Sequence, residues 1–341
     1  MTREESEQPF VSILVCTCNR QDNVVPTIRS IQASGYQNFE VLILDQSRDE
    51  STARALQPLC EADPRLKYVR LDMPNKPRAL NRGRELAKGR YLLLTDDDCE
   101  VRAGWVGEIV RVFEADSRVG CVFGDVEAGP CDPDKGYIPA YRVTQARSIS
   151  TLSEFLTMPG WGNFGMGANM ALRADALASI GGWDPCVGPG AFFRSGDDHD
   201  VVARLLAAGF ALAFSPTAVA VHFGLRHWES MGADQTRYGF GMGAIFAKHL
   251  RTRSYYPGPL RVFSDRLFTV ARGLSLRKGP VGLAYPRSWL LGLVHGLRHP
   301  VDRRTRCFVY SDDARRGTTE RVARVILRSS QGEPGAPTKA S

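Results

Sequence analysis

Two clusters of carboxylates stand out because each lies where a secondary structure element is expected to begin or end. The first is Thr95-Asp96-Asp97-Asp98, which follows the apolar run Tyr91–Thr95. Adjacent carboxylates repel one another, so a folded protein keeps three of them together mainly where a cation offsets their charge. Oxygen ligands at a strand end suit Mg²⁺ or Mn²⁺ bridging a diphosphate. The cluster predicts a metal site, and the alternative is a solvated acidic turn that caps a helix at Ala103.

The second cluster is Gly196-Asp197-Asp198-His199-Asp200, at the start of a helix predicted over residues 197–208. Carboxylates interact favourably with the free N–H groups at a helix N-terminus, so helix capping is one interpretation. Three aspartates exceed what one cap needs, however. A base that deprotonates an acceptor hydroxyl in a cleft requires such a positioned carboxylate, so the cluster also indicates general-base catalysis.

The elements that must position these clusters alternate between strand and helix. Apolar runs of strand length occur at residues 10–17, 39–45, 66–71 and 91–95, and helical patterns separate them at residues 22–33, 50–59 and 78–88. Strands that are apolar on both faces and alternate with helices predict an α/β fold with a doubly wound, mostly parallel sheet. Ligands of such sheets collect at the carboxyl ends of the strands. Residues 17–20, Asp45 and the first acid cluster all fall there.

Beyond Val126 the pattern is looser. A Gly-rich stretch covers residues 160–167, residues 205–225 are expected to form a helix end and two short strands, and helical segments such as residues 237–250 dominate from Arg226 onward. We therefore predict a flexible N-terminus (1–9), a catalytic domain (10–225), a basic helical extension (226–328) and a disordered tail (329–341).

Five motifs in this order resemble glycosyltransferases of family 2, which have the GT-A fold. They run from VSILVCTCNR through FEVLILDQSRDEST, RALNRGRELAKGRYLLLTDDD and GANMALRADALASIGGWD to SGDDHDVVARLLAAG, followed by PTAVAVH. The resemblance covers about residues 10–225. It implies an inverting transferase that uses a nucleotide-sugar donor and Mn²⁺ or Mg²⁺.

The resemblance also implies site residues. Asp198 matches the acid usually assigned as the catalytic base, with Asp197 beside it on the acceptor side. Asp98 and Asp96 match the metal-binding DxD pair, and His222 follows a short strand where some GT-A enzymes place a metal-ligating histidine. The remaining donor contacts are assigned to Thr17, Asn19, Arg20, Asp45, Arg78, Asn81 and Asp97.

Two tryptophans near these motifs have two interpretations. Trp161 and Trp183 could stack on an acceptor sugar, and packing in a core is the equally open alternative.

The chain departs from the family pattern at two places. Asp45-Gln46-Ser47-Arg48 stands where Asp-Asp-Gly-Ser is common, and the Trp motif of processive synthases is missing. We expect transfer of one sugar from a UDP-, dTDP- or GDP-sugar to a carbohydrate or lipid-linked acceptor, in the synthesis of a cell-surface polysaccharide, glycolipid or related glycoconjugate.

Charge and cysteine content bear on partners and location. Residues 226–341 contain 21 Lys and Arg against 8 Asp and Glu, a net charge of +13, whereas residues 1–225 carry −6. This asymmetry suggests peripheral contact with an anionic membrane, and the alternative is that the Arg stems cover apolar surface. No spacing of the eight cysteines matches a zinc site, so we expect buried thiols in a cytoplasmic protein. No stretch predicts a membrane span or a signal peptide.

Two other functions compete with the transferase. A sugar nucleotidyltransferase would carry a Gly-rich, basic loop after the first strand, which Cys18-Asn19-Arg20-Gln21 matches poorly. A non-catalytic module that binds anionic membranes or nucleic acid would fit the basic third. The acid clusters argue against that module, and no nucleic acid is expected, because carboxylates repel phosphates unless a metal is bound.

Overall fold

The computed structural model describes residues 8–72, 74–157, 164–252 and 281–310. The chain divides into two units, residues 1–308 and residues 309–341, and the description below concerns the first. The predicted termini (1–9 and 329–341) and the expected contacts of Trp161 fall wholly or largely outside the described residues.

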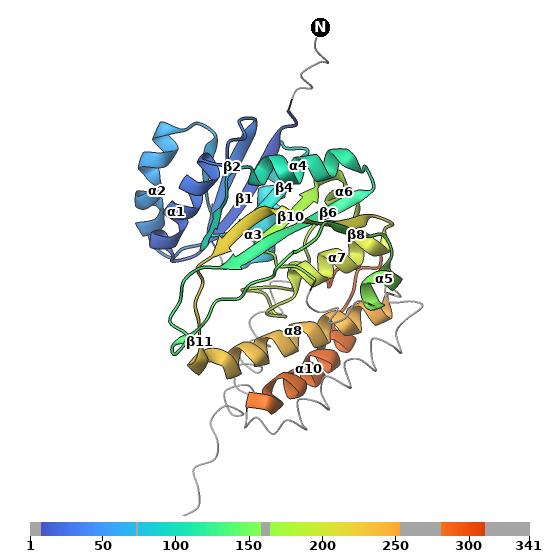
Figure 1. Ribbon diagram of the computed structural model, residues 1–341. Coiled ribbons are helices and arrows are strands. Elements are labelled where there is room, and N and C mark those ends of the chain that lie inside the picture. The colour runs from blue at the N-terminus through green and yellow to red at the C-terminus, as the bar shows by residue number, and fades with distance from the viewer. Residues whose placement is uncertain (1–7, 73, 158–163, 253–280, 311–341) are drawn as a thin grey trace, which may run out of the picture. The chain divides into compact units, whose positions relative to one another are not determined.

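A nine-stranded mixed sheet runs through the first unit, in the order β3-β2-β1-β4-β9-β6-β10-β5, with β8 also paired to β10 (Figure 1). Strands β1, β2, β3 and β4 are parallel, as are β6 and β10, whereas β9 is antiparallel to both of its neighbours. The strands of this sheet are β1 (Val11–Thr17), β2 (Phe39–Asp45), β3 (Leu66–Arg70), β4 (Tyr91–Asp96), β5 (Cys99–Val101), β6 (Val119–Ala128), β8 (Arg147–Ile149), β9 (Asn169–Arg173) and β10 (Ala211–His222). A separate pair joins β7 (Gly136–Tyr137) to β11 (Arg226–His227).

Helices cover both faces of the sheet. They are α1 (Gln21–Gln32), α2 (Ser51–Ala62), α3 (Lys76–Leu86), α4 (Trp105–Ala115), α5 (Leu152–Thr157), α6 (Ala174–Ser179), α7 (Asp197–Ala207), the 3₁₀ turn η1 (Trp228–Ser230), α8 (Met231–Arg251) and α10 (Val281–Arg298). Alternate residues of each central strand point to opposite faces. In β1, Ile13 packs with α1, α2 and α4, while Leu14 packs with α3, α6 and α7. This two-sided burial explains why the strands are apolar throughout.

The sequence predicted this doubly wound, mostly parallel α/β sheet, and its strand boundaries agree within one residue for β1 to β4. One expectation was wrong. Residues 205–225 were expected to contain two short strands, but β10 is continuous from Ala211 to His222. Its register against β6 shifts between Ser215 and Val219, where Pro216 interrupts the ladder. A proline within a strand is tolerated at such a bulge, because its missing N–H costs no ladder hydrogen bond there.

The C-terminal helices α8 and α10 lie side by side (Figure 1). Glycines line their contact. A side chain at Gly243 would strike the Trp289 carbonyl of α10, and one at Gly292 would strike the Phe240 carbonyl of α8. The helical C-terminal part is therefore as predicted, and Phe246 and Trp289 join the core that the sheet shares with α7. Within the described residues, neither helix is long and apolar enough to cross a membrane.

Candidate active site

The first acid cluster forms the turn between β4 and β5, at the carboxyl edge of the parallel strands. Asp96 ends β4, and Asp97 and Asp98 are largely buried in the turn. Arg20, from the loop after β1, donates from one nitrogen to Asp97 Oδ1 at 3.0 Å and to Asp98 Oδ2 at 2.9 Å. Burial raises the pKa of Asp97 to about 6 despite the nearby guanidinium. The residues assigned from the sequence to donor and metal are thus in direct contact.

His222 joins this cluster from the end of β10. Its Nε2 lies 3.3 Å from Asp98 Oδ1, and its Nδ1 lies 2.8 Å from the Pro139 carbonyl. If Nδ1 carries the proton donated to that carbonyl, Nε2 of the neutral ring presents a lone pair to a carboxylate. Two acceptors face each other in this way only with a proton or a metal cation between them. Burial opposes protonation of His222, but the hydrogen bonds to Asp98 and Pro139 outweigh it and raise its pKa.

Gly224 leaves space beside the same two side chains. A Cβ built on it would lie against Asp98 Oδ2 and 2.6 Å from His222 Nε2. Metal–ligand bonds to oxygen and nitrogen are about 2.0–2.2 Å long, so this space is within reach of both ligand atoms. The position of His222 Nε2 beside the Asp98 carboxylate and the space at Gly224 both fit a divalent cation at Asp98 and His222. Asp96, the third predicted ligand, instead pairs with Lys76, and its role at the metal stays a prediction.

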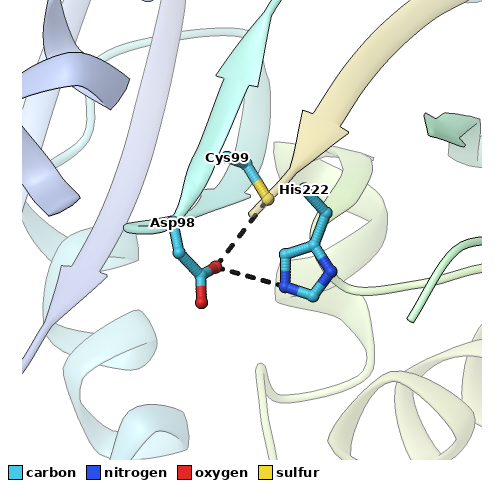
Figure 2. Close-up of side chains that lie close together, drawn as sticks. All are labelled: Asp98, Cys99 and His222. Carbon is cyan, nitrogen blue, oxygen red and sulfur yellow. Dashed lines mark hydrogen bonds and ion pairs between the residues drawn. The ribbon is translucent and has the colours of Figure 1, made fainter. Parts of the chain in front are cut away.

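The thiol of Cys99 lies beside Asp98 and His222. Asp98, Cys99 and His222 each offer one ligand atom, and the three atoms lie within 4.8 Å of one another. Figure 2 shows the carboxylate, the thiol and the imidazole turned toward a common point from the β4–β5 turn and the two paired strands. Cys99 was not predicted from the sequence, because only the antiparallel pairing of β5 with β10 places it opposite His222.

The second acid cluster begins α7. Gly196 is the N-cap, in the left-handed region with φ of 89°, and as a glycine it offers no capping side chain. Asp198 bonds a backbone N–H of the first turn, so the structure is consistent with a helix-terminal role for this carboxylate, and its catalytic role stays a prediction. Asp198 accepts from the backbone N–H of His199 at 2.8 Å and lies 3.0 Å from His199 Nδ1. Burial raises the pKa of Asp198, but these contacts with His199 outweigh it and lower the pKa below its usual value.

Lys76 lies between the two clusters, and the sequence analysis did not single it out. It is the first residue of α3, whose N-cap Asn75 accepts from the Arg78 N–H at 3.0 Å. Its ammonium pairs with Asp96, and the charges of Asp96 and Asp197 raise its pKa against the effect of burial. Burial and the charge of Asp198 raise the pKa of Asp197 to about 7, although Lys76 opposes this. The structure therefore gathers acids from β4 and α7 around one lysine.

The predicted nucleotide contacts lie on the loops after β1 and β2. Thr17 is buried at the end of β1, and Asn19 takes the left-handed conformation with φ of 55°. The backbone N–H of Asn19 donates to Ser47 Oγ at 2.7 Å, which ties the two loops together. Asp45 is fully buried and accepts hydrogen bonds from the backbone N–H of Ser47 and from the Tyr68 hydroxyl. Both of its oxygens are thus engaged within the protein, and its contact with the donor stays a prediction.

Asn81 and Trp183, which were expected to contact the donor and the acceptor sugar, are hydrogen-bonded to each other. Asn81 of α3 donates to the Trp183 carbonyl at 2.8 Å and accepts from the Trp183 N–H at 2.9 Å. The Trp183 side chain is only 2% exposed and lies in the core. This burial favours the packing interpretation of Trp183 over stacking on a sugar. Arg78 is exposed on the first turn of α3, next to Lys76 and Pro77.

Comparison with known proteins identifies the family and the fold. Residues 12–181 match the model of glycosyl transferase family 2. A GalNAc(5)-diNAcBac-PP-undecaprenol beta-1,3-glucosyltransferase of Campylobacter jejuni is 29% identical over 119 residues, which are 34% of this chain and 38% of that protein. A putative colanic acid biosynthesis glycosyl transferase of Escherichia coli is 35% identical over 111 residues, 31% of this chain and 37% of that one. The matched regions thus span less than two fifths of these relatives.

Solved structures extend the likeness of fold along the chain. A mannosyltransferase of Pyrobaculum calidifontis, solved with GDP-Man and Mn²⁺, superimposes with a TM-score of 0.56 at 17% identity, over 86% of this chain and 88% of that one. TarS of S. aureus (residues 1–349) superimposes with a TM-score of 0.57 at 13% identity, over 83% of this chain and 81% of that one. These likenesses establish the GT-A fold.

Proposed function

Because the chain belongs to glycosyl transferase family 2, we propose that it transfers a single sugar from a nucleoside-diphosphate sugar to an acceptor hydroxyl, with inversion at the anomeric carbon. The observation that carries this proposal is that Lys76 pairs with Asp96 of the first acid cluster while its charge also acts on Asp197 of the second, at the carboxyl edge of the sheet. One cluster is suited to hold a cation and a diphosphate, and the other to accept a proton. An inverting transfer needs both on the same site.

On the donor side, Asp98 and His222 would hold a divalent cation, which as a Lewis acid stabilises the departing diphosphate. Lys76 and Arg20 place positive charge beside the first acid cluster, where the diphosphate would bind. Arg20 is 46% exposed, so its guanidinium can turn from the carboxylates toward a phosphate. The donor is a UDP-, dTDP- or GDP-sugar. The mannosyltransferase with a similar fold was solved with GDP-Man, and TarS with UDP-GlcNAc.

On the acceptor side, Asp198 acts as the general base. Its lowered pKa keeps it ionised at neutral pH, and its side chain remains 22% exposed, so an acceptor hydroxyl can reach it. The deprotonated hydroxyl then attacks the anomeric carbon from the face opposite the leaving group. We propose a carbohydrate or lipid-linked acceptor in glycoconjugate synthesis, since the relative from C. jejuni is named for an undecaprenol-linked substrate.

Two charge-neutralising substitutions test the two halves of the site. Asp98→Asn should abolish metal-dependent binding of a nucleoside diphosphate, measured by calorimetry with Mn²⁺.

Asp198→Asn should preserve that binding and lower turnover by about 10²-fold or more, the scale of lost general-base catalysis. Loss of donor affinity in Asp198→Asn with turnover preserved would instead place Asp198 in the donor pocket.

The substrate is identified by a screen of nucleotide sugars for hydrolysis and transfer, with and without Mn²⁺. NMR of the product from the active donor then reports the anomeric configuration. A product that retains the donor configuration would contradict the single displacement.

A further inference from the structure

The cluster at Asp98 differs from an all-oxygen site because one of its three ligand atoms is sulfur. Cys99 is fully buried and is paired directly with His222 across the antiparallel strands β5 and β10. Residues paired in this way have Cβ atoms about 4.5–5.5 Å apart and project from the same face of the sheet. The thiol and the imidazole are therefore held together by backbone pairing.

The distances fit ligands of a common ion. Asp98 Oδ1 lies 3.3 Å from His222 Nε2 and 3.9 Å from Cys99 Sγ. Bonds from zinc are about 2.0–2.2 Å to oxygen or nitrogen and about 2.3 Å to sulfur. Two ligands of one ion cannot be further apart than the sum of their bonds, roughly 4 Å or slightly more here. Both of these separations meet the limit. The third, between Cys99 Sγ and His222 Nε2, is no more than 4.8 Å, so a common ion requires at most a small rotation of these side chains.

We propose that Cys99 is a third metal ligand and that this site takes a thiophilic divalent cation of the Zn²⁺ class in preference to Mg²⁺. On binding, a metal–sulfur bond forms, the S–H bond breaks and the proton leaves to water, so no change of oxidation state is needed. The thiolate and the Asp98 carboxylate together balance the charge of the ion. The proposal rests on the proposed metal site at Asp98 and His222 and concerns which ion that site selects.

The donor set explains the preference. Mg²⁺ takes oxygen ligands almost exclusively, whereas imidazole and thiolate favour Zn²⁺ and its spectroscopic substitutes Co²⁺ and Cd²⁺. Mn²⁺ binds more weakly than Zn²⁺ to a given site of this kind. Zn²⁺ should therefore displace Mn²⁺ from the full-length protein.

Titration with Co²⁺ and Cd²⁺ tests the sulfur ligand directly, because a metal–thiolate bond gives an ultraviolet charge-transfer absorption that oxygen and nitrogen ligands do not. The wild-type chain should show this absorption, and Cys99→Ser and Cys99→Ala should lose it. Their Zn²⁺ affinity should fall by more than the roughly 10- to 100-fold that loss of a supporting outer group costs. Cys60→Ser, at a partly buried cysteine of α2, is the control and should keep the absorption. Circular dichroism checks that each variant is folded.

The outcomes separate this inference from the proposed function. Cadmium binding that requires Asp98 but gives no charge-transfer absorption would overturn the sulfur ligand and leave the metal site intact. A charge-transfer absorption that is the same in Cys99→Ser as in the wild-type chain would have the same meaning. Failure of the wild-type chain to bind Zn²⁺, Cd²⁺ or Mn²⁺, with or without a nucleoside diphosphate, would overturn both.

Discussion

Gly224 shows how much a single missing side chain can matter at this site. Only hydrogen separates its backbone from the space between Asp98 and His222. We predict that Gly224→Ala folds but loses measurable Mn²⁺-dependent binding of a nucleoside diphosphate, because the methyl group would occupy the position of the ion.

The matched control for this substitution is Gly232→Ala, near the start of α8, where a Cβ meets nothing within 4 Å. Calorimetry on both variants makes the comparison. Equal metal-dependent affinity in Gly224→Ala and wild type would show that the ion binds elsewhere.

His199 controls the charge of the proposed base. Its contacts lower the pKa of Asp198, so Asp198 stays ionised well into the acidic range. Removing the imidazole should raise that pKa, and the acid limb of the pH profile of kcat/KM should move to higher pH, since this profile reports the free enzyme.

His199→Asn tests this expectation, and His227→Asn, at an exposed histidine of β11, is the control. A profile of kcat/KM that does not move in His199→Asn would argue that another group is the base.

At the level of helices, α7 is tied to α8 by buried charge. Asp200, which follows the proposed base by two residues, lies 2.8 Å from Arg204 and 2.5 Å from Lys248 of α8, and all three side chains are at most 1% exposed. Lys248 also lies 2.5 Å from Asp184. Removing one partner of a buried ion pair leaves a charge without compensation, which costs about 3–5 kcal/mol.

We therefore predict that Lys248→Met lowers the free energy of unfolding by about this amount. Denaturant unfolding measures the loss. Arg82→Met is the comparison, because Arg82 and Glu85 form a pair that is about half exposed, and such pairs contribute about 0–1 kcal/mol. Similar losses in both variants would mean that the buried cluster is not held by charge.

The elements that the sequence predicted best are those defined by local pattern. The apolar runs gave β1 to β4, and the three aspartates after β4 and the three at α7 were recognised by their position at element ends. Lys76 and Cys99 escaped because nothing near them in the sequence reports their neighbours. Cys99 became relevant only through pairing with His222, and Lys76 only through its contact with Asp96 at the end of β4. The periodicity of apolar residues along the sequence cannot predict such long-range pairings.

Across the whole chain, the sequence suggested that a basic third docks on a membrane. Residues 253–280 and 311–341 of that segment lie outside the described residues. In the described part, Trp289 is buried, so it belongs to the core. Leu290, Val294 and Leu297 are 55%, 41% and 46% exposed and follow one another at helical spacing on α10. Arg287 and Arg298 on the same helix are exposed.

An apolar stripe flanked by arginines is suited to an anionic lipid surface. We predict that the protein sediments with anionic vesicles at low salt and is released at high salt, because each basic residue contributes only about 1 kcal/mol and is screened. Val294→Glu should weaken this binding, and neutral vesicles are the control. Equal recovery in the supernatant with both vesicle types would leave the arginines as cover for apolar surface.

The pairing of Cys99 with His222 would also couple binding of the proposed ion to folding. The two residues are far apart in the sequence, and they meet only when β10 has closed against β5. An ion that needs both Asp98 and His222 binds the native chain and not the unfolded one, so it adds to the free energy of unfolding by mass action, about 2.7 kcal/mol at a hundredfold excess over Kd. The outermost strand pair of this sheet would thus be the part of the fold whose opening frequency depends on the free concentration of the ion.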